Sequence, residues 1–405
     1  MRNNRRVVVT GIGIVSALGI GRDKFWDNIK KGKSGISKIT SIDTSAYKCH
    51  YGGEVKDFNP EDFIPKRRIK FLGKTSQLAI AAAYLALQDS GIPLKRIPKE
   101  SMGVIMGTTI GEKAIEELAA QWAKGGLKEI DRKKLFQAAA NNIPANVAIQ
   151  FKAMGLNCLI PNACAAGNYA IGYGYDLIRN KDLNFALVGG SESFSPLAYA
   201  GFQRLYAMSP DKCSPFDKNR KGMMLGEGSG ILFLESLESA LKRKVKIYAE
   251  ILGYGLSCDA YHATAPDPKG IARVMQKALD QANISYKEVD YVCAHGTGTP
   301  ANDKAESAAV KEVFKERHKE VLVSSIKSML GHTMGASSAI AGAACCLGIK
   351  EGIVPPTINF ETPDPECDID CVPNKARKKD LNVVLNNGFA FGGNNCCVAF
   401  GKYSG

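Results

Sequence analysis

The 405-residue sequence lacks an apolar run long enough to cross a membrane. Its longest such tract, residues 339–349, is well short of the ~20 residues that a membrane-spanning helix needs. Glycines interrupt the apolar stretch near the N-terminus, and no small-residue cleavage pattern follows it, so we predict no signal peptide. We therefore expect a cytoplasmic protein without a membrane partner.

The sequence also lacks the common signatures of nucleotide and metal sites. It contains no G-x-x-x-x-G-K-S/T motif, no H-E-x-x-H motif and no pair of spaced C-x-x-C motifs. The turn at residues 11–13 is missing the third glycine and the later acidic residue of a dinucleotide fingerprint. Twelve cysteines are present, but in a long chain without a signal peptide we expect them to be reduced and mostly buried. The sequence predicts no metal site.

Composition and charge narrow the class of protein. With 45% hydrophobic and 23% charged residues the chain is an ordinary globular protein, which excludes disordered, collagen-like and coiled-coil chains. Lysine and arginine outnumber the acids 53 to 40, and the net charge of +13 indicates nucleic acid, a membrane surface or an acidic protein as a partner. Basic residues cluster at 66–70 and at 375–379, and we expect the second cluster to be ordinary solvated surface.

Strand-like apolar runs alternate with helical patterns along the chain, which indicates an α/β fold with mainly parallel strands. A weak internal repeat accompanies this alternation. Each half contains a helix of small residues after a strand-like run, at about 165–178 and 336–349, a composition that suits the buried centre between layers. We therefore predict two similar halves, residues 1–250 and 251–405, which share one continuous core.

Cys164 is the first candidate for chemistry, in the segment Asn-Ala-Cys-Ala-Ala-Gly. It follows a strand-like run and lies at the predicted start of a helix. Unpaired backbone N–H groups and the positive end of the helix dipole favour a thiolate there, and a thiolate is a nucleophile. The alternative is that Cys164 is one more buried cysteine among the twelve.

Two of the five histidines lie in matched glycine-flanked turns. His295 stands in Ala-His-Gly-Thr-Gly-Thr and His332 in Gly-His-Thr-Met-Gly, so the repeat predicts a shared site. Lys327 lies between an apolar strand and His332. A buried lysine requires a partner, which Glu306 or Asp303 could supply.

Cys164, His295, Lys327, His332 and a glycine-rich turn at 388–395 together resemble a β-ketoacyl-acyl-carrier-protein synthase of the condensing-enzyme family. Taken alone, the turn is either a simple hairpin or a loop that presents backbone N–H groups to an oxyanion. The likeness covers nearly the whole chain and is closest to the type II elongating synthases of fatty acid synthesis. Supporting segments lie at 214–220, 225–228, 257–262 and 354–359.

The resemblance implies a thiolase fold, in which two α/β halves stack as five layers, α-β-α-β-α. It also implies a dimer, formed either by two identical chains or with a related ketosynthase-like subunit. The implied partner is an acidic acyl carrier protein, and no nucleic acid is implied.

The resemblance further implies a decarboxylative condensation. Cys164 would accept an acyl group from the carrier protein as a thioester. His295 and His332 would stabilise the enolate, or activate the water involved, when a malonyl thioester loses carbon dioxide; the carbanion then attacks the acyl thioester. Backbone N–H groups of Cys164 and Phe391 would form the oxyanion hole. No metal or organic cofactor is implied, because the phosphopantetheine arm arrives on the carrier protein.

Other residues match family positions around this site. Lys327 and its acidic partner Glu306 would hold the electrostatic setting of the histidines, and Phe391 would be the gating aromatic beside the cysteine. Thr297 and Thr299 match hydroxyls that bind the phosphopantetheine arm, Ile110 and Phe202 match the lining of the acyl pocket, and Lys66, Arg67, Arg68 and Lys70 match the basic patch that docks the carrier protein.

The chain departs from the family pattern near the substrate. Its nucleophile motif is unusual, Ala390 replaces a glycine of the gating turn, and Tyr206 stands where a basic carrier-protein contact is usual, with Arg204 nearby. A ketosynthase of a specialised type II polyketide or aryl polyene pathway, paired with a non-identical subunit, is therefore an alternative. A non-catalytic chain-length subunit is a second alternative, against which the retained Cys164 argues, and a Cys/His hydrolase is a third.

Overall fold

The computed structural model describes residues 5–405, and its two halves have the same strand order. Numbered in chain order within each half, the five main strands lie side by side as 3-2-4-5-1. This shared order matches the internal repeat expected from the sequence. The N-terminal strands are β1 (Val7–Ser16), β5 (Met102–Gly107), β6 (Asn157–Ile160), β7 (Phe185–Glu192) and β8 (Gly228–Ser236). The C-terminal strands are β9 (Ala249–Cys258), β10 (Tyr291–Cys293), β11 (Leu322–Ser324), β14 (Val383–Phe389) and β15 (Asn394–Gly401).

The strands are not mainly parallel, so that prediction is wrong. In the N-terminal half β5 runs parallel to β6 and β7, but β7, β8 and β1 pair antiparallel. The C-terminal half repeats this pattern, with β10 parallel to β11 and β14 and the remaining pairs antiparallel. The short turn between β14 and β15 requires an antiparallel pair, whereas the parallel neighbours β5/β6 and β10/β11 are joined by connections that contain helices.

A short antiparallel pairing of Val7–Val9 with Ala249–Ile251 joins the two halves into one eleven-stranded sheet, in which the short β2 (Gly19–Ile20) pairs with β1. Two central helices contact strands of both halves, and the other long helices cover the outer faces. This is the predicted five-layer arrangement. The central helices are α7 (Ala166–Arg179) and α13 (Ser337–Glu351); the outer ones are α3 (Lys74–Asp89) and α6 (Asn142–Phe151) on the N-terminal half, and α10 (Pro268–Ala282) and α11 (Pro300–Phe314) on the C-terminal half.

The two central helices pack closely because they are built from small residues. A Cβ atom at Gly167 of α7 would lie 2.6 Å from the backbone nitrogen of Ala339 in α13, so only glycine fits there. The backbone N–H of Asn168 donates to the Ser338 hydroxyl at 2.9 Å across the same interface. The prediction that small-residue helices fill the buried centre is confirmed.

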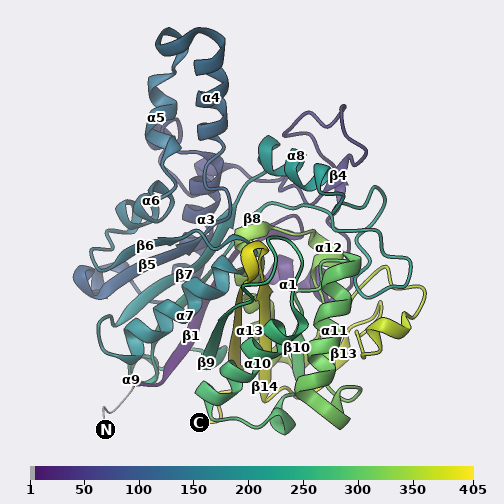
Figure 1. Ribbon diagram of the computed structural model, residues 1–405. Helices are drawn as coiled ribbons and strands as arrows, with labels where there is room; N and C mark the ends of the chain where they lie inside the picture. The colour runs from purple at the N-terminus through teal and green to yellow at the C-terminus, as the bar shows by residue number, and fades with distance from the viewer. Residues whose placement is uncertain (1–4) are drawn as a thin grey trace.

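A helical hairpin projects from the N-terminal half (Figure 1). It consists of α4 (Ala114–Gly125) and α5 (Arg132–Ala138) and exposes Trp122, Leu127 and Phe136. Within residues 5–405, no helix is both long and apolar enough to span a membrane. Shorter elements are α1 (Arg22–Lys30), α2 (Lys66–Ile69), α8 (Pro196–Arg204), α9 (Leu237–Arg243), α12 (Lys327–Leu330), β3 (Ser37–Lys38), β4 (Tyr51–Gly52), β12 (Ile353–Val354) and β13 (Arg377–Lys378).

Candidate active site

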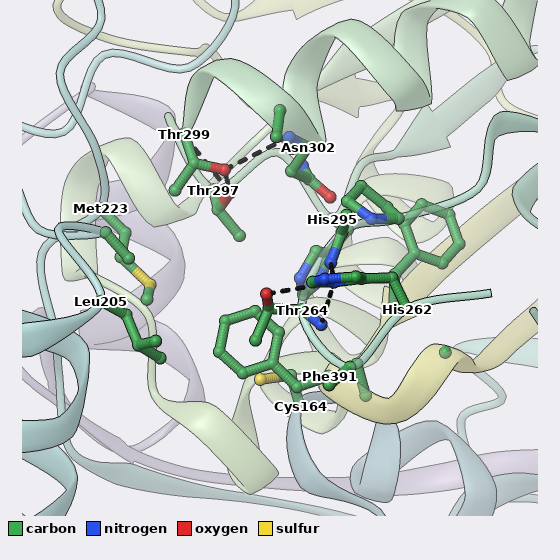
Figure 2. Close-up of a pocket in the computed structure, with 18 of the residues that line it drawn as sticks. Cys164, Leu205, Met223, His262, Thr264, His295, Thr297, Thr299, Asn302 and Phe391 are labelled. Carbon is green, nitrogen blue, oxygen red and sulfur yellow. Dashed lines mark hydrogen bonds between the residues drawn. The ribbon is translucent and has the colours of Figure 1, made fainter. Parts of the chain in front are cut away.

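A cavity of about 310 Å³ collects side chains from both halves of the chain. Cys164 and Phe391 lie together at one end of it, whereas Thr297 and Thr299 lie on a separate wall (Figure 2). His295 and His332 also line the cavity, as do Phe202, Leu205, Tyr206, Met223, His262, Thr264, Asn302 and Asn395. The structure thus brings residues from separate sequence motifs to one place.

Cys164 lies in the single turn Ala163–Ala165, directly before α7, and is buried. Burial raises the pKa of its thiol to about 12, although the charge of Lys327 acts in the opposite direction. The expectation that the helix N-terminus favours a thiolate at Cys164 is not supported for the resting chain, because burial disfavours the charged form of the thiol. Cys164 starts as a thiol, so its proton must leave during any attack on a substrate.

His295 and His332 face each other edge to face, with ring centroids 5.4 Å apart. Burial, together with the positive charge of Lys327, holds the pKa of each imidazole well below 6.5, so both rings are neutral at physiological pH. The backbone N–H of Met334 donates to Nδ1 of His332 at 3.2 Å. The proton of this neutral ring is therefore on Nε2, which makes His332 a hydrogen-bond donor at the cavity.

Lys327 and Glu306 hold the main chain of His295 from two sides. The Lys327 ammonium group donates to the carbonyl oxygen of His295. The Glu306 carboxylate accepts the backbone N–H groups of His295 at 2.9 Å and of Gly296 at 2.7 Å, and the amide of Asn387 at 3.0 Å. Both charged groups are buried, and burial lowers the pKa of Lys327 and raises that of Glu306. The position of the His295 ring is thus set through its backbone.

The expected ion pair of Lys327 with Glu306 or Asp303 does not form among residues 5–405. Glu306 is occupied by backbone N–H groups, and Asp303 accepts the N–H groups of Phe216 at 2.8 Å and of Gly298 at 3.2 Å. The two carboxylates are therefore used to fix loops around the cavity. Lys327 and Glu306 are linked only through the main chain of His295, whose carbonyl accepts from Lys327 and whose N–H donates to Glu306.

Thr297 and Thr299 hold their hydroxyl groups close together at the cavity wall (Figure 2). The two oxygens are 2.9 Å apart. Thr299 also caps α11, because its hydroxyl accepts the backbone N–H of Asn302 at 3.4 Å. This capping fixes the direction of the Thr299 side chain relative to the cavity.

Glu192 is a buried carboxylate that the sequence reasoning missed. It accepts the backbone N–H groups of Thr109 at 2.6 Å, of Ile110 at 3.1 Å and of Gly335 at 3.0 Å. It therefore ties the loop after β5 to the turn that follows His332. The sequence signal that could have identified Glu192 is an acidic residue at the end of an otherwise uncharged strand.

The glycine-rich turn connects β14 to β15 and also places Phe391 at the cavity. The rings of Phe391 and Phe202 lie 5.7 Å apart, and Phe391 is 38% exposed. Gly392 and Gly393 have positive φ angles of 83° and 74°, which favour glycine. Ala390 is extended, with φ −129°, so an alanine fits there without strain.

Two further groups of predicted residues lie outside this cavity. Ile110 packs in the apolar cluster that contains Phe202 but is not part of the cavity lining. The four basic residues lie on or directly after α2: Lys66, Arg67 and Lys70 are exposed, whereas Arg68 is half-buried and donates to the side chain of Gln150 on α6.

Five layers in two similar halves, with a cysteine from one half and two neutral histidines from the other at one cavity, define the class of thiolase-type condensing enzymes. Comparison with known proteins agrees. Residues 4–240 match the family model "Beta-ketoacyl synthase, N-terminal domain", and residues 248–361 match the model of the C-terminal domain. The chain belongs to the β-ketoacyl synthase family and is an acyltransferase.

Three relatives illustrate the similarity. The 3-oxoacyl-[acyl-carrier-protein] synthase 2 of Synechocystis sp. is 41% identical over 98% of both chains. The solved ishigamide ketosynthase/chain length factor superposes with a TM-score of 0.96 at 42% identity, covering 99% of this chain and 100% of that one. A type II PKS ketosynthase, bound to the hexaketide and solved in complex with its acyl-carrier protein, superposes with a TM-score of 0.91 at 34% identity, again over 99% and 100%.

Proposed function

We propose that the protein condenses a malonyl thioester with an acyl group held on Cys164, which extends the acyl chain by two carbons. The meeting of Cys164, His295 and His332 at one cavity carries this proposal. Full-length similarity to 3-oxoacyl-[acyl-carrier-protein] synthase 2 enzymes supports the same chemistry.

In the first step, the sulfur of Cys164 attacks the carbonyl carbon of an acyl thioester. A new C–S bond forms, the C–S bond to the phosphopantetheine sulfur breaks, and the cysteine proton goes to that leaving sulfur. Because burial raises the thiol pKa to about 12, the proton moves during the attack, and a neutral histidine that lines the same cavity can relay it. Backbone N–H groups of Cys164 and Phe391 donate to the oxyanion of the tetrahedral intermediate.

In the second step, a malonyl thioester loses carbon dioxide. The electron pair of the broken C–C bond forms an enolate, whose oxygen accepts the N–H of a neutral imidazole. The enolate carbon then attacks the Cys164 thioester, the C–S bond to the enzyme breaks, and the sulfur takes up a proton from solvent. Lys327 and Glu306 act as positioning residues, since they hold the His295 main chain in place.

The acyl and malonyl groups arrive on an acyl carrier protein in this proposal. The exposed basic residues Lys66, Arg67 and Lys70, together with Arg68, support docking of an acidic partner. A related solved ketosynthase in complex with its carrier protein points the same way.

We also propose a dimer, formed with an identical chain or with a related subunit. β6 is the last strand in the sheet order, and its outer edge pairs with no strand among residues 5–405. An unpaired edge is a template for another chain. The exposed apolar residues Trp122, Leu127 and Phe136 on the neighbouring hairpin would enlarge that interface.

The test supplies purified protein with hexanoyl- and malonyl-acyl carrier protein and measures β-ketoacyl product and carbon dioxide. We expect product from the wild type and none from Cys164→Ala. Cys371→Ala, which removes a buried thiol from a loop outside the cavity, is the matched control and should retain activity. Condensation by Cys164→Ala at the wild-type rate would overturn the proposal, as would thioester hydrolysis without release of carbon dioxide.

A ketosynthase of a specialised polyene or polyketide pathway is a second candidate, favoured by the similarity to the ishigamide ketosynthase/chain length factor. Such an enzyme should prefer unsaturated or aryl acyl groups and require a non-identical subunit. Competition between saturated and unsaturated acyl-carrier thioesters separates the two candidates. Efficient turnover of saturated chains by the protein alone would count against the specialised pathway.

A further inference from the structure

Glu192, the last residue of β7, is a fully buried carboxylate that forms no ion pair among residues 5–405. Its Oε1 accepts the Thr108 hydroxyl and the backbone N–H of Ile110, both at 3.1 Å. Its Oε2 accepts the backbone N–H of Thr109 at 2.6 Å and that of Gly335 at 3.0 Å. An ionised carboxylate only accepts hydrogen bonds and has room for all four donors, so these partners match the charged form.

Packing alone does not explain a charge at this position. Taking a carboxylate out of water without a cation beside it is unfavourable. Burial accordingly raises the pKa of Glu192, although the four hydrogen-bond donors act in the opposite direction. The charge is therefore held at a cost in stability, and the role of the residue must be sought in the segments that it joins.

The first of these segments, the loop 108–110, leads to the nucleophile. Gly107, the residue before the loop, touches the first turn of α7, since a Cβ atom there would lie 2.4 Å from the carbonyl carbon of Ala166. The turn Ala163–Ala165, which carries Cys164, directly precedes that residue. The position of the loop thus bears on the position of the sulfur through backbone contact.

The second segment, the turn Met334–Ala336, leads to the histidine. The backbone N–H of Met334 holds Nδ1 of His332 at 3.2 Å, so this turn orients the ring. At Gly335 the turn touches the loop, because a Cβ atom there would lie 2.4 Å from the Cα atom of Thr108. The carboxylate of Glu192 therefore clamps two backbones that are in direct contact, one from the cysteine side and one from the histidine side.

We propose that Glu192 is a positioning residue for the condensation, which fixes the Cys164 sulfur and the His332 ring relative to each other. The proposal rests on the proposed function, in which an enolate formed beside a histidine attacks the thioester on the cysteine. Reacting atoms must stand about 3–3.5 Å apart for such a step, and a displacement of about 1 Å can slow it ~100-fold. This requirement gives the unfavourable buried charge a function.

The charge of Glu192 also acts on the nucleophile. Burial is the main cause of the raised pKa of the Cys164 thiol, and the negative charge of Glu192 adds to it, whereas the positive charge of Lys327 opposes both. Loss of the charge should therefore make the thiolate easier to form, and loss of the hydrogen bonds should slow condensation. The two effects are separable, because Glu192→Gln removes the charge whereas Glu192→Asp keeps it and shortens the reach.

The experiment measures two rates in the wild type, Glu192→Gln and Glu192→Asp. The first is condensation of hexanoyl- with malonyl-acyl carrier protein, and the second is alkylation of Cys164 by iodoacetamide at pH 8, followed by mass spectrometry of the peptide that contains it. Thermal unfolding of each variant is measured alongside.

Glu54→Gln is the matched control. Glu54 is also buried, forms no ion pair among residues 5–405, and accepts the backbone N–H groups of Thr40 at 3.1 Å and of Ser41 at 2.7 Å. It lies outside the cavity that contains Cys164. This variant therefore loses similar hydrogen bonds at a place where they hold no reacting group.

Glu192→Gln should lower kcat for condensation about 100-fold and yet speed alkylation of Cys164 about 3- to 10-fold. Glu192→Asp should lower kcat by a similar factor, with alkylation within about twofold of the wild-type rate because the charge remains. Glu54→Gln should keep both rates of the wild type, even where its unfolding temperature falls.

A wild-type kcat in either folded Glu192 variant would overturn the proposal, as would an equal loss of kcat in Glu54→Gln. Should Glu192→Gln not fold, Glu192→Asp decides by the same criterion. Equal acceleration of alkylation in both Glu192 variants would trace the reactivity to loosened packing and contradict the assigned charge. A folded wild type that forms no condensation product would instead refute the proposed function, so the two failures are distinguishable.

Discussion

Replacement of Glu112 by glutamine tests whether this buried carboxyl group, which lies next to the cavity loops, holds a proton in the folded chain. Glu112 accepts the backbone N–H groups of Thr75 at 3.2 Å and of Ser76 at 2.8 Å, so it caps the first turn of α3 from another segment. The carboxylate also fills the space beside Gly73, where a Cβ atom would lie 2.0 Å from an oxygen. Burial raises its pKa to about 7 from an ordinary 4.5, despite these hydrogen bonds.

Because the pKa of Glu112 is raised in the folded chain, this group makes the free energy of unfolding fall as the pH rises. The folded chain holds the Glu112 proton more tightly than the unfolded chain, so the proton stabilises the fold below pH 4.5, and that stabilisation is lost as the pH rises through 7. Between pH 5 and pH 8 the wild type should lose about 2.5 kcal/mol through this group. Glu112→Gln cannot ionise and leaves one N–H group without an acceptor, a cost that does not change with pH.

Urea unfolding of both proteins, at one protein concentration and one ionic strength, measures the difference. Relative to the wild type, the variant should gain about 2.5 kcal/mol of unfolding free energy from pH 5 to pH 8. All other titrating groups are shared and cancel. A difference that is constant over this range would refute the assigned protonation of Glu112.

Three further predictions concern the site. Lys66→Glu with Arg67→Glu should raise KM for carrier-protein substrates about tenfold, while leaving KM for small thioesters near its wild-type value; equal effects on both would rule out docking at α2. Phe391→Ala removes the ring that packs on Phe202 at 5.7 Å, so acylation kinetics should lose discrimination between acyl lengths, and an unchanged substrate profile would contradict the gate. Because burial holds the pKa values of both active-site histidines well below 6.5, malonyl decarboxylation should stay constant from pH 8 to pH 6; a decline centred near pH 6.5 would contradict their neutrality.

The sequence could single out the residues that meet at the cavity because each stands in a distinctive local pattern. Cys164, His295 and His332 all lie in turns of glycine and alanine that precede helices, and the repeat related the two halves. The small-residue composition of α7 and α13 likewise predicted their place at the centre. Each of these patterns can be recognised in a short stretch of sequence, and the fold then brings the stretches together in space.

Other features depend on contacts that leave no local pattern. The sequence indicated that Lys327 needs a partner, but its partner is a backbone carbonyl, which every residue possesses. Glu192 and Glu112 are single acids whose partners are backbone N–H groups distant in sequence. The raised pKa of the Cys164 thiol comes from its depth in the folded chain, which a helix start visible in the sequence does not reveal.

The central claim is that Cys164 carries the acyl group, and mass spectrometry of the acylated protein tests it most directly. After incubation with hexanoyl-acyl carrier protein alone, the peptide that contains Cys164 should gain the mass of one hexanoyl group. Addition of malonyl-acyl carrier protein should remove that mass as β-ketoacyl product appears. Formation of product with no acyl group ever bound to Cys164, or with the acyl group on another residue, would contradict the account.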